Sequence, residues 1–156
     1  MARIDSLGNV LWQRTYGQLY SNLSTITALD DGSYALAGYQ LRVPAGQQFV
    51  GDGWLLRIDL DGRELRSLRT GQGTQTYSWY DLRALPNGGV LVVGSHVPIS
   101  YSGQPNQGVL ARFDSLNQSL GMHYVTAAQP SGTYGVELHR LELLQGNDFL
   151  VQGYRY

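Results

Sequence analysis

The chain has 156 residues, the length of one ordinary domain, and 42% of them are hydrophobic, which is enough to build a packed core. Its formal net charge of −1 gives no electrostatic reason to expect nucleic acid or an anionic membrane as a partner. The absence of Cys excludes disulfides and thiolate metal sites, and no apolar run approaches the roughly 18 residues of a membrane span.

The pattern with which the chain begins returns twice. The three copies start with Ala2-Arg3-Ile4-Asp5, Leu56-Arg57-Ile58-Asp59 and Ala111-Arg112-Phe113-Asp114. Each copy leads into a turn signal, at 6–9, 60–63 and 115–118. A fixed period of about 50 residues is typical of propellers, solenoids and other repeat arrays.

A second repeated block follows each copy and is centred on a turn. The turn dipeptides are Asp31-Gly32, Asn87-Gly88 and Gly146-Asn147. Such pairs supply the positive φ angles that tight hairpin turns require. Because no segment carries a sustained apolar stripe with a 3.6-residue period, no helix is predicted. The sequence therefore predicts an all-β protein whose repeat unit is two hairpins.

We name the four expected strands of a unit A to D. The A strands are expected at 23–29, 79–85 and 138–144, and the B strands at 33–40, 89–96 and 148–155. The C strands are expected at 2–5, 53–59 and 108–114, and the D strands at 10–16, 64–70 and 119–125. Strand B is apolar on both faces, which indicates a sheet covered on both sides, as in a propeller blade. Leu36, Val92 and Val151 should therefore be fully buried.

The predicted fold is a single β-propeller region of three four-stranded antiparallel blades, with units at about 1–41, 53–97 and 108–156. One blade would be assembled from the two terminal hairpins, 2–16 and 138–155. Three blades are fewer than the usual four to eight, and about 120° per blade is a wide wedge to fill. We therefore expect further blades, supplied either by a longer parent protein or by a homodimer partner.

The first unit carries the most complete form of the repeat, in Asp5, Gly8, Asn9, Leu11, Trp12, Tyr16, Gly17, Asp31, Gly32 and Gly38-Tyr39. With these residues the chain resembles, over nearly its whole length, the blade repeats of bacterial and archaeal secreted β-propeller proteins. Later units depart from it, with Arg66 and Gly121 at the position of Trp12.

Five residues also fit the docking repeat of quinoprotein-type propellers: Ala2, Asp5, Gly8, Leu11 and Trp12. In those proteins the repeat packs blades together, so this likeness implies no cofactor. The resemblance to secreted propellers implies an extracellular or cell-surface location, although no signal peptide is recognised in these residues. It names no active site.

Structural roles explain the candidate catalytic features better than chemistry does. Asp59-Leu60-Asp61-Gly62 resembles the start of a calcium loop, but Thr70 stands where the loop needs Glu. A turn-forming Asp is expected instead, and the repeated Arg-x-Asp is expected to form a blade-to-blade ion pair or to cap turns. An enzyme acting on polysaccharide would need the cluster of Asp81, Arg83, Arg140 and Glu142. We expect no catalytic residue, metal or cofactor, with that enzyme as the alternative.

The A–B and C–D turns should share one rim of the blades, which leaves the longer D–A and B–C connections on the opposite rim. Aromatic and amide side chains gather near these connections: Tyr77, Trp79, Tyr80, Tyr101, Asn106 and Tyr134. Variable loops on a rigid scaffold commonly carry binding sites, and such side chains suit a protein or carbohydrate ligand. The rings could equally cover the core at this rim. The sequence thus predicts a binding scaffold, with a structural spacer as a further alternative.

Overall fold

The structure is a computed structural model that describes residues 1–42, 50–71, 75–98, 105–129, 132–144 and 148–156. Apart from one 3₁₀ turn, η1 (Pro86–Gly88), the regular structure of these residues consists of β-strands. The all-β prediction is confirmed. In this part of the chain, no helix has the length and apolar character needed to cross a membrane.

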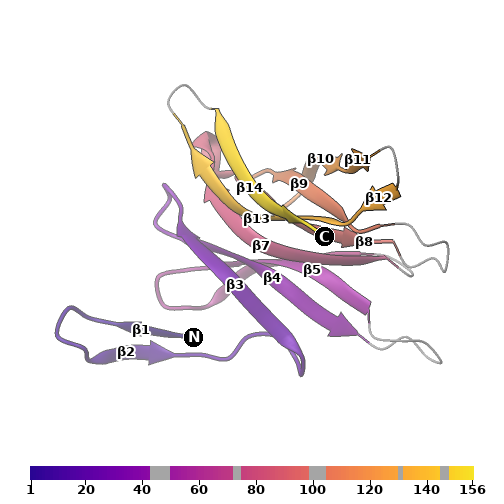
Figure 1. The fold of residues 1–156 in the computed structure, drawn as a ribbon. Helices are drawn as coiled ribbons and strands as arrows, with labels where there is room; N and C mark the ends of the chain where they lie inside the picture. Colours follow the sequence, from indigo (N-terminus) through magenta and orange to yellow (C-terminus); the bar gives the residue numbers. More distant parts are fainter. Residues whose placement is uncertain (43–49, 72–74, 99–104, 130–131, 145–147) are drawn as a thin grey trace.

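Two four-stranded antiparallel sheets form the centre of the molecule (Figure 1). The first sheet is ordered β3 (Ser21–Ala28), β4 (Tyr34–Arg42), β5 (Val50–Ile58) and β6 (Glu64–Thr70). We use the word blade as a label for each of these four-stranded sheets. The second blade is ordered β7 (Thr76–Ala84), β8 (Val90–Val97), β9 (Gln107–Phe113) and β10 (Ser119–Val125). Each blade therefore contains strands A, B, C and D in the predicted order.

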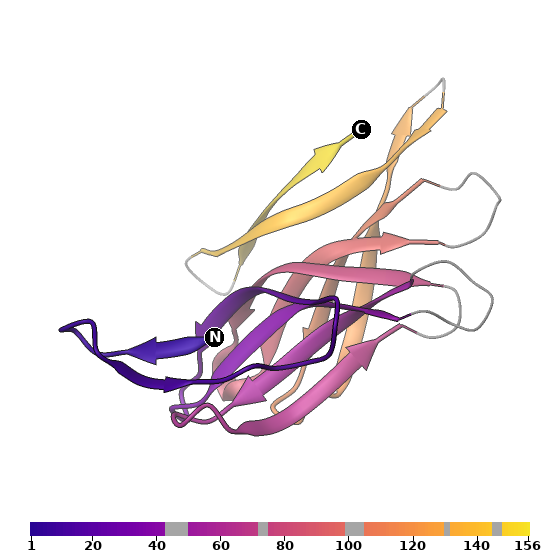
Figure 2. The same ribbon diagram turned by 90° about the horizontal axis from the view of Figure 1, so that it is seen from below.

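The chain ends form hairpins of their own. The first hairpin is β1 (Ala2–Ile4) with β2 (Val10–Gln13), and the last hairpin is β13 (Val136–Leu143) with β14 (Phe149–Arg155). They lie at opposite ends of the molecule, with the two blades between them (Figures 1 and 2). The composite blade expected from 2–16 and 138–155 is thus not formed within one chain. A short hairpin of β11 (Ala127–Gln129) and β12 (Gly132–Tyr134), which the sequence did not predict, precedes β13.

All three A–B pairs contain the same irregularity. The register shifts beside Ser24, Tyr80 and His139, and the facing strands carry Gly38, Gly94 and Gly153 at these bulges. A Cβ atom at Gly94 would overlap the carbonyl oxygen of Ser78, and Gly38 and Gly153 meet their facing backbones in the same way. The recurring glycine is therefore a requirement for close backbone approach at a bulge.

The repeated Asp closes its own turn. The Asp59 Oδ1 atom accepts hydrogen bonds from the backbone nitrogens of Asp61 at 2.9 Å and Arg63 at 2.8 Å. Asp5 and Asp114 make the equivalent pairs of bonds in their turns. These contacts confirm the turn-forming role predicted for the repeated Asp.

The repeated Arg reaches the following blade. Arg57 is buried, and its Nε atom donates to Asn117 Oδ1 at 2.6 Å. Its Nη2 atom donates to the carbonyl oxygens of Gly88 at 2.7 Å and Asp114 at 3.1 Å, both in turns of the second blade. Arg3 likewise donates to the carbonyl oxygen of Leu60, at 2.9 Å. Of the two expected roles, turn capping is therefore the one observed, and among the described residues Arg3 and Arg57 do not form the expected ion pair between blades.

The blades share cores where their faces meet. Between the two blades, Ala35, Ala37 and Leu55 of the first pack with Trp79 and Leu82 of the second. A second cluster joins the second blade to the last hairpin: Leu91, Val93, Val136, Leu138 and Leu141. Both faces of the second blade are therefore covered, as its apolar strand B predicted.

The expectation that Leu36, Val92 and Val151 would all be fully buried is correct for the first two and wrong for Val151, which is half-buried. Val151 lies on β14, and no strand of the described chain pairs with the outer edge of β14. The missing neighbour accounts for its exposure.

Candidate functional site

The loop rim is the end of the sheets at which β3, β7 and β13 begin and β4, β8 and β14 end. The antiparallel order of both blades places the B–C and D–A connections here and the short turns at the opposite end. This agrees with the prediction that the two kinds of connection occupy opposite rims. The candidate site lies on the loop rim where the second blade meets the last hairpin.

Six side chains form what we call the tyrosine–histidine cluster: Tyr80, Asn106, Glu137, His139, Tyr154 and Tyr156. At its centre the rings of Tyr80 and His139 are stacked, with centroids 4.2 Å apart and planes inclined by 7°. The Tyr154 ring lies on His139 at 4.7 Å. Tyr154 and Tyr156 are exposed, whereas Tyr80 and His139 are half-buried.

The repeat explains why these two rings meet. Tyr80 and His139 are the bulge residues of β7 and β13, which are equivalent strands of successive units. Because equivalent strands of neighbouring blades lie side by side, their bulge residues project at the same height. The Tyr80 hydroxyl lies 3.1 Å from Ser95 Oγ of β8, which fixes the ring against its own blade.

A carboxylate joins the polar groups of the cluster. Glu137 Oε2 lies 2.9 Å from His139 Nε2, and Glu137 Oε1 accepts a hydrogen bond from the Tyr156 hydroxyl at 3.1 Å. The Asn106 side-chain amide donates to the same hydroxyl. The backbones of Tyr156 and Gly135 exchange two hydrogen bonds, of 2.9 and 3.1 Å, so the end of the chain is held in place.

The electrostatics keep the phenols protonated. Burial raises the pKa of Tyr80, and burial together with the nearby Glu137 charge raises the pKa of Tyr156. Both hydroxyls can therefore donate hydrogen bonds at neutral pH. The cluster offers aromatic surface, hydroxyl donors and a carboxylate acceptor on one exposed edge, a combination suited to a ligand with both apolar faces and hydroxyl groups.

The predicted site residues separate into three groups. Tyr80 and Asn106 belong to the cluster. Tyr77 and Trp79 lie in the core between the blades, where Tyr77 stacks on His96 at 4.6 Å and Trp79 meets Phe113 edge to face at 6.2 Å.

The other two predicted residues give no side-chain information. Tyr101 lies outside the described residues, and Tyr134 is placed on β12 with its side chain outside them. For Tyr77 and Trp79 the alternative of covering the core is therefore the one observed. Of the six predicted residues, Tyr80 and Asn106 are the two that the structure places in the cluster.

Sequence reasoning did not identify Glu137, His139, Tyr154 and Tyr156 as site residues, and it did not connect His139 with Tyr80. The available signal was the repeated glycine at 94 and 153, because a glycine facing each bulge marks Tyr80 and His139 as equivalent positions.

Of the four residues that the alternative enzyme would need, Asp81, Arg83 and Glu142 are joined by ion pairs, and Asp81 also has a structural role. Asp81 Oδ1 lies 2.9 Å from Arg83 Nη1, and the same carboxylate accepts hydrogen bonds from Thr25 of the first blade and from the backbone nitrogen of Leu141. Arg83 also reaches Glu142, at 3.4 Å. Asp81 therefore joins three successive units, and both of its oxygens are occupied.

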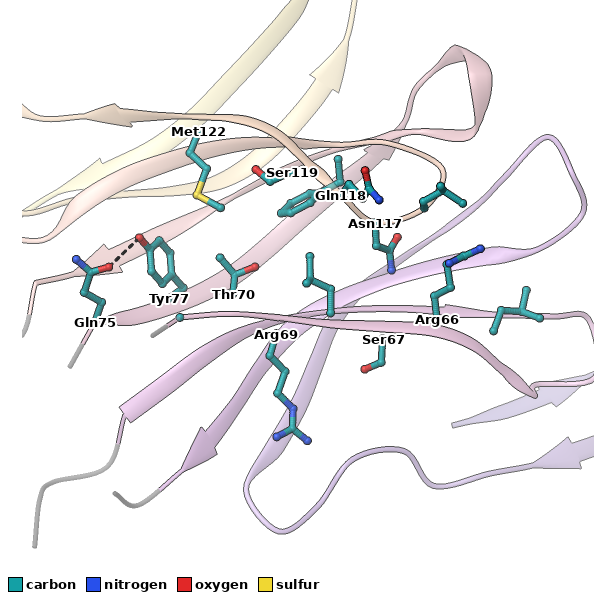
Figure 3. Close-up of a pocket in the computed structure, with 15 residues that line it drawn as sticks. Arg66, Ser67, Arg69, Thr70, Gln75, Tyr77, Asn117, Gln118, Ser119 and Met122 are labelled. Atoms are coloured by element: carbon teal, nitrogen blue, oxygen red, sulfur yellow. Dashed lines mark hydrogen bonds between the residues drawn. The ribbon is translucent and has the colours of Figure 1, made fainter. Parts of the chain in front are cut away.

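A groove of 790 Å³ runs between β6 and β10, the outermost strands of the two blades (Figure 3). Thr70, Tyr77 and Met122 line one end of it, and the Tyr77 hydroxyl is 2.9 Å from that of Tyr124. Arg69 points away from the groove in Figure 3. The groove is the wedge left where the outer strands diverge, and its polar groups do not converge on one point.

In the described part of the chain, no three His, Asp or Glu side chains lie together in a way that could hold a metal ion. Comparison with protein-family models and with curated proteins finds no match to this chain. The case for a function therefore stands on the geometry of the tyrosine–histidine cluster and on the repeat.

Proposed function

We propose that the chain is a non-catalytic β-propeller scaffold of a secreted or cell-surface protein, and that its tyrosine–histidine cluster binds carbohydrate. The scaffold part is supported by the repeat: two complete blades and two half-blades share one register, one set of bulges and one pattern of turn contacts. Further blades complete the ring. The location follows from the resemblance of the repeat to those of secreted propellers.

One observation carries the binding part. The exposed Tyr154 ring adjoins the Tyr80–His139 stack, and hydroxyl, amide and carboxylate groups lie around it. A sugar presents apolar C–H faces and hydroxyl groups together, so rings beside hydrogen-bonding groups provide complementary contacts. Stacking fixes the Tyr80 and His139 rings, and Ser95 and Glu137 hold their polar atoms, so these two rings lose little freedom on binding.

The proposal is tested by screening the chain on a glycan array and measuring the affinity of any bound glycan by calorimetry. Tyr154→Ala should weaken binding by about tenfold or more, corresponding to about 1.4 kcal/mol. Tyr20→Ala is the control, because Tyr20 is similarly exposed but lies at the start of the first blade. No glycan binding, or binding unchanged by Tyr154→Ala, would contradict the proposal; peptide binding lost in Tyr154→Ala would replace carbohydrate as the ligand.

A further inference from the structure

Each terminal hairpin has a strand edge that is paired in the complete blades. Strand B pairs with strand C as β4 with β5 and as β8 with β9. In the last hairpin, β14 is a strand B without a strand C, and in the first hairpin, β1 is a strand C without a strand B. The two open edges are therefore complementary.

The complete blades specify the register that would join these edges. Tyr34, Ala35 and Leu36 face Ile58, Arg57 and Leu56, and Val90, Leu91 and Val92 face Phe113, Arg112 and Ala111. The A–B pairs align Phe149 with Tyr34 and Val90, and the C–D pairs align Ile4 with Ile58 and Phe113. Phe149 would then face Ile4, Leu150 would face Arg3, and Val151 would face Ala2.

Three apolar positions of the repeat are buried where a neighbouring strand or unit covers them and exposed where that neighbour is missing. Ile4 is 61% exposed, whereas its equivalents Ile58 and Phe113 are both 0% exposed. Leu150 is 59% exposed, against 0% for Ala35 and 6% for Leu91. Ile26 is 51% exposed, against 0% for Leu82 and Leu141.

The neighbour that would cover Ile26 can be named from the repeat. Leu82 packs against the first blade's Ala35 and Ala37, and Leu141 packs with the second blade's Leu91 and Val93. The equivalent of Ala35 and Leu91 on β14 is Leu150. Leu150 and Ile26 would therefore cover each other if a last hairpin packed against the face of the first blade.

Two cavities lie where these contacts would form. One of 600 Å³ is lined by residues of the second blade and the last hairpin, among them Leu110, Leu143 and Phe149, beside the open edge of β14. The other, of 410 Å³, is lined by Ile26, Leu36 and Trp54 on the face of the first blade. A β1–β2 hairpin from another copy of the chain would fill the first cavity. A β13–β14 hairpin from another copy would pack beside the second.

The repeated Arg gives an independent indication. Arg3 and Arg57 each donate to a backbone carbonyl in the C–D turn of the following unit, at Leu60 and Asp114. Arg112, the third member, is exposed. If the first hairpin of another copy followed the second blade, its C–D turn would be residues 5–9. Arg112 would then stand to this turn as Arg57 stands to the turn at Asp114.

We propose that two copies of this chain associate head to tail, with β14 of each pairing with β1 of the other, and close a six-bladed ring. The proposal rests on the propeller scaffold inferred above and specifies its partner. Each copy supplies two complete blades and the two halves of a third, so two copies give six blades, within the usual four to eight, whereas three copies would give nine. Twofold symmetry makes both junctions identical and pairs the open edges of β1 and β14 in both copies.

Light scattering on the purified full chain tests the proposal. The expected mass is twice the 17.2 kDa of one chain. Leu150→Arg would place a positive charge opposite Arg3 of the partner, and like charges facing each other across two strands oppose pairing. This variant should raise the dissociation constant of the dimer at least tenfold, and Leu150→Arg combined with Arg3→Glu should recover most of the loss.

Leu65→Arg is the matched control, because Leu65 is similarly exposed but lies on β6 of a complete blade, and it should leave the dimer unchanged. A far-ultraviolet spectrum establishes that each variant is folded. A wild-type monomer, an open series of larger species, or a dimer that survives Leu150→Arg overturns the proposal. Glycan binding measured on the same samples separates the two proposals, since binding retained by a monomer would leave the proposed function standing.

Discussion

The second blade and the last hairpin carry the same repeat but differ in what surrounds them. In the second blade, β8 is paired on both sides and covered on both faces, and every residue from Val90 to His96 is buried. In the last hairpin, Gly153 of β14 faces a bulge at His139, as Gly94 of β8 faces the bulge at Tyr80. However, β14 is paired only with β13, and most of its residues are exposed. Local sequence therefore determines the hairpin, while burial depends on the neighbouring units.

Single substitutions at equivalent positions can test this difference. We take all stability comparisons on the Leu150→Arg background, in which association through the open edges is opposed and each chain is measured alone. The predictions follow from the largest expected effect to the smallest.

The largest effect is expected at Trp79, whose side chain is completely buried between the blades. Trp79→Ala should lower the free energy of unfolding by about 3–5 kcal/mol, because it removes a large apolar side chain and leaves a cavity. Tyr154→Ala, at the exposed end of β14, should stay within about 1 kcal/mol while losing the ligand. Urea denaturation gives both values. Equal decreases in the free energy of unfolding would contradict the assignment of Trp79 to the core and of Tyr154 to the binding site.

Arg57 and Arg3 occupy the same repeat position, and only Arg57 is buried. Arg57→Ala should cost about 2–3 kcal/mol, because Asn117 Oδ1 and two turn carbonyls lose a charged donor in a buried setting. Arg3→Ala should cost less than about 1 kcal/mol, since its carbonyl partner at Leu60 is open to water. The same denaturation experiment compares them, and a larger cost for Arg3 would contradict the role assigned to Arg57.

Val92 and Val151 compare the two environments most closely, since both are central residues of a strand B. Val92→Ala should cost about 1–3 kcal/mol from lost burial and the resulting cavity. Val151→Ala should cost clearly less, because Val151 is only half-buried. The difference should shrink in the background with the natural Leu150, where pairing would cover Val151. Equal costs in the Leu150→Arg background would mean that the face of β14 is covered by something within the chain.

The smallest effect concerns the A–B turns. Asp31 accepts hydrogen bonds from the hydroxyl and the backbone nitrogen of Ser33, which lower its pKa below the ordinary 3.8. A carboxyl with a lowered folded-state pKa contributes stability above its unfolded-state pKa and loses it as the pH falls through the folded-state value. Asp31→Asn should therefore reduce the loss of stability below a pH of about 4, measured by denaturation at neutral and acidic pH.

The second blade provides a natural comparison, because Asn87 stands at the equivalent position and does not titrate. Asn87→Asp should add less to the loss of stability at low pH than Asp31 does, because Gly89 stands where Ser33 supplies its hydroxyl. The exposed turn limits the size of both effects. A pH dependence unchanged by Asp31→Asn would show that these hydrogen bonds do not contribute to stability.

The arrangement of the strands could be predicted from the sequence because the hairpins are encoded locally. Turn pairs such as Asp31-Gly32 and the repeated Asp at 5, 59 and 114 specify where the chain reverses, and the apolar strand B specifies the middle of each sheet. The β11–β12 hairpin was missed because residues 127–134 have no counterpart in the other units. The other hairpins were predicted from repeated turn signals, and residues 127–134 carry no such repeat.

The site was harder to predict because neighbouring side chains of a strand point to opposite faces of the sheet, and the sequence alone does not show which unit covers each face. Along β7, Tyr77 and Trp79 face the core, while Tyr80 at the bulge faces the rim and His139. A count of aromatic residues near a connection does not distinguish these directions. The pairing of Tyr80 with His139 also depends on the contact between two units, which propensity and turn signals do not describe.

The most direct test of the open-edge account is amide hydrogen exchange along Phe149–Gln152 of β14 in the unmodified chain. Alternate amides of a strand point to opposite neighbours, so a strand paired on one side protects only every second amide. If β1 of a second copy occupies the edge, successive amides should all exchange slowly, as in Val90–Val93 of β8. Slow and fast amides in alternation along β14, at a protein concentration where β8 is fully protected, would contradict the account.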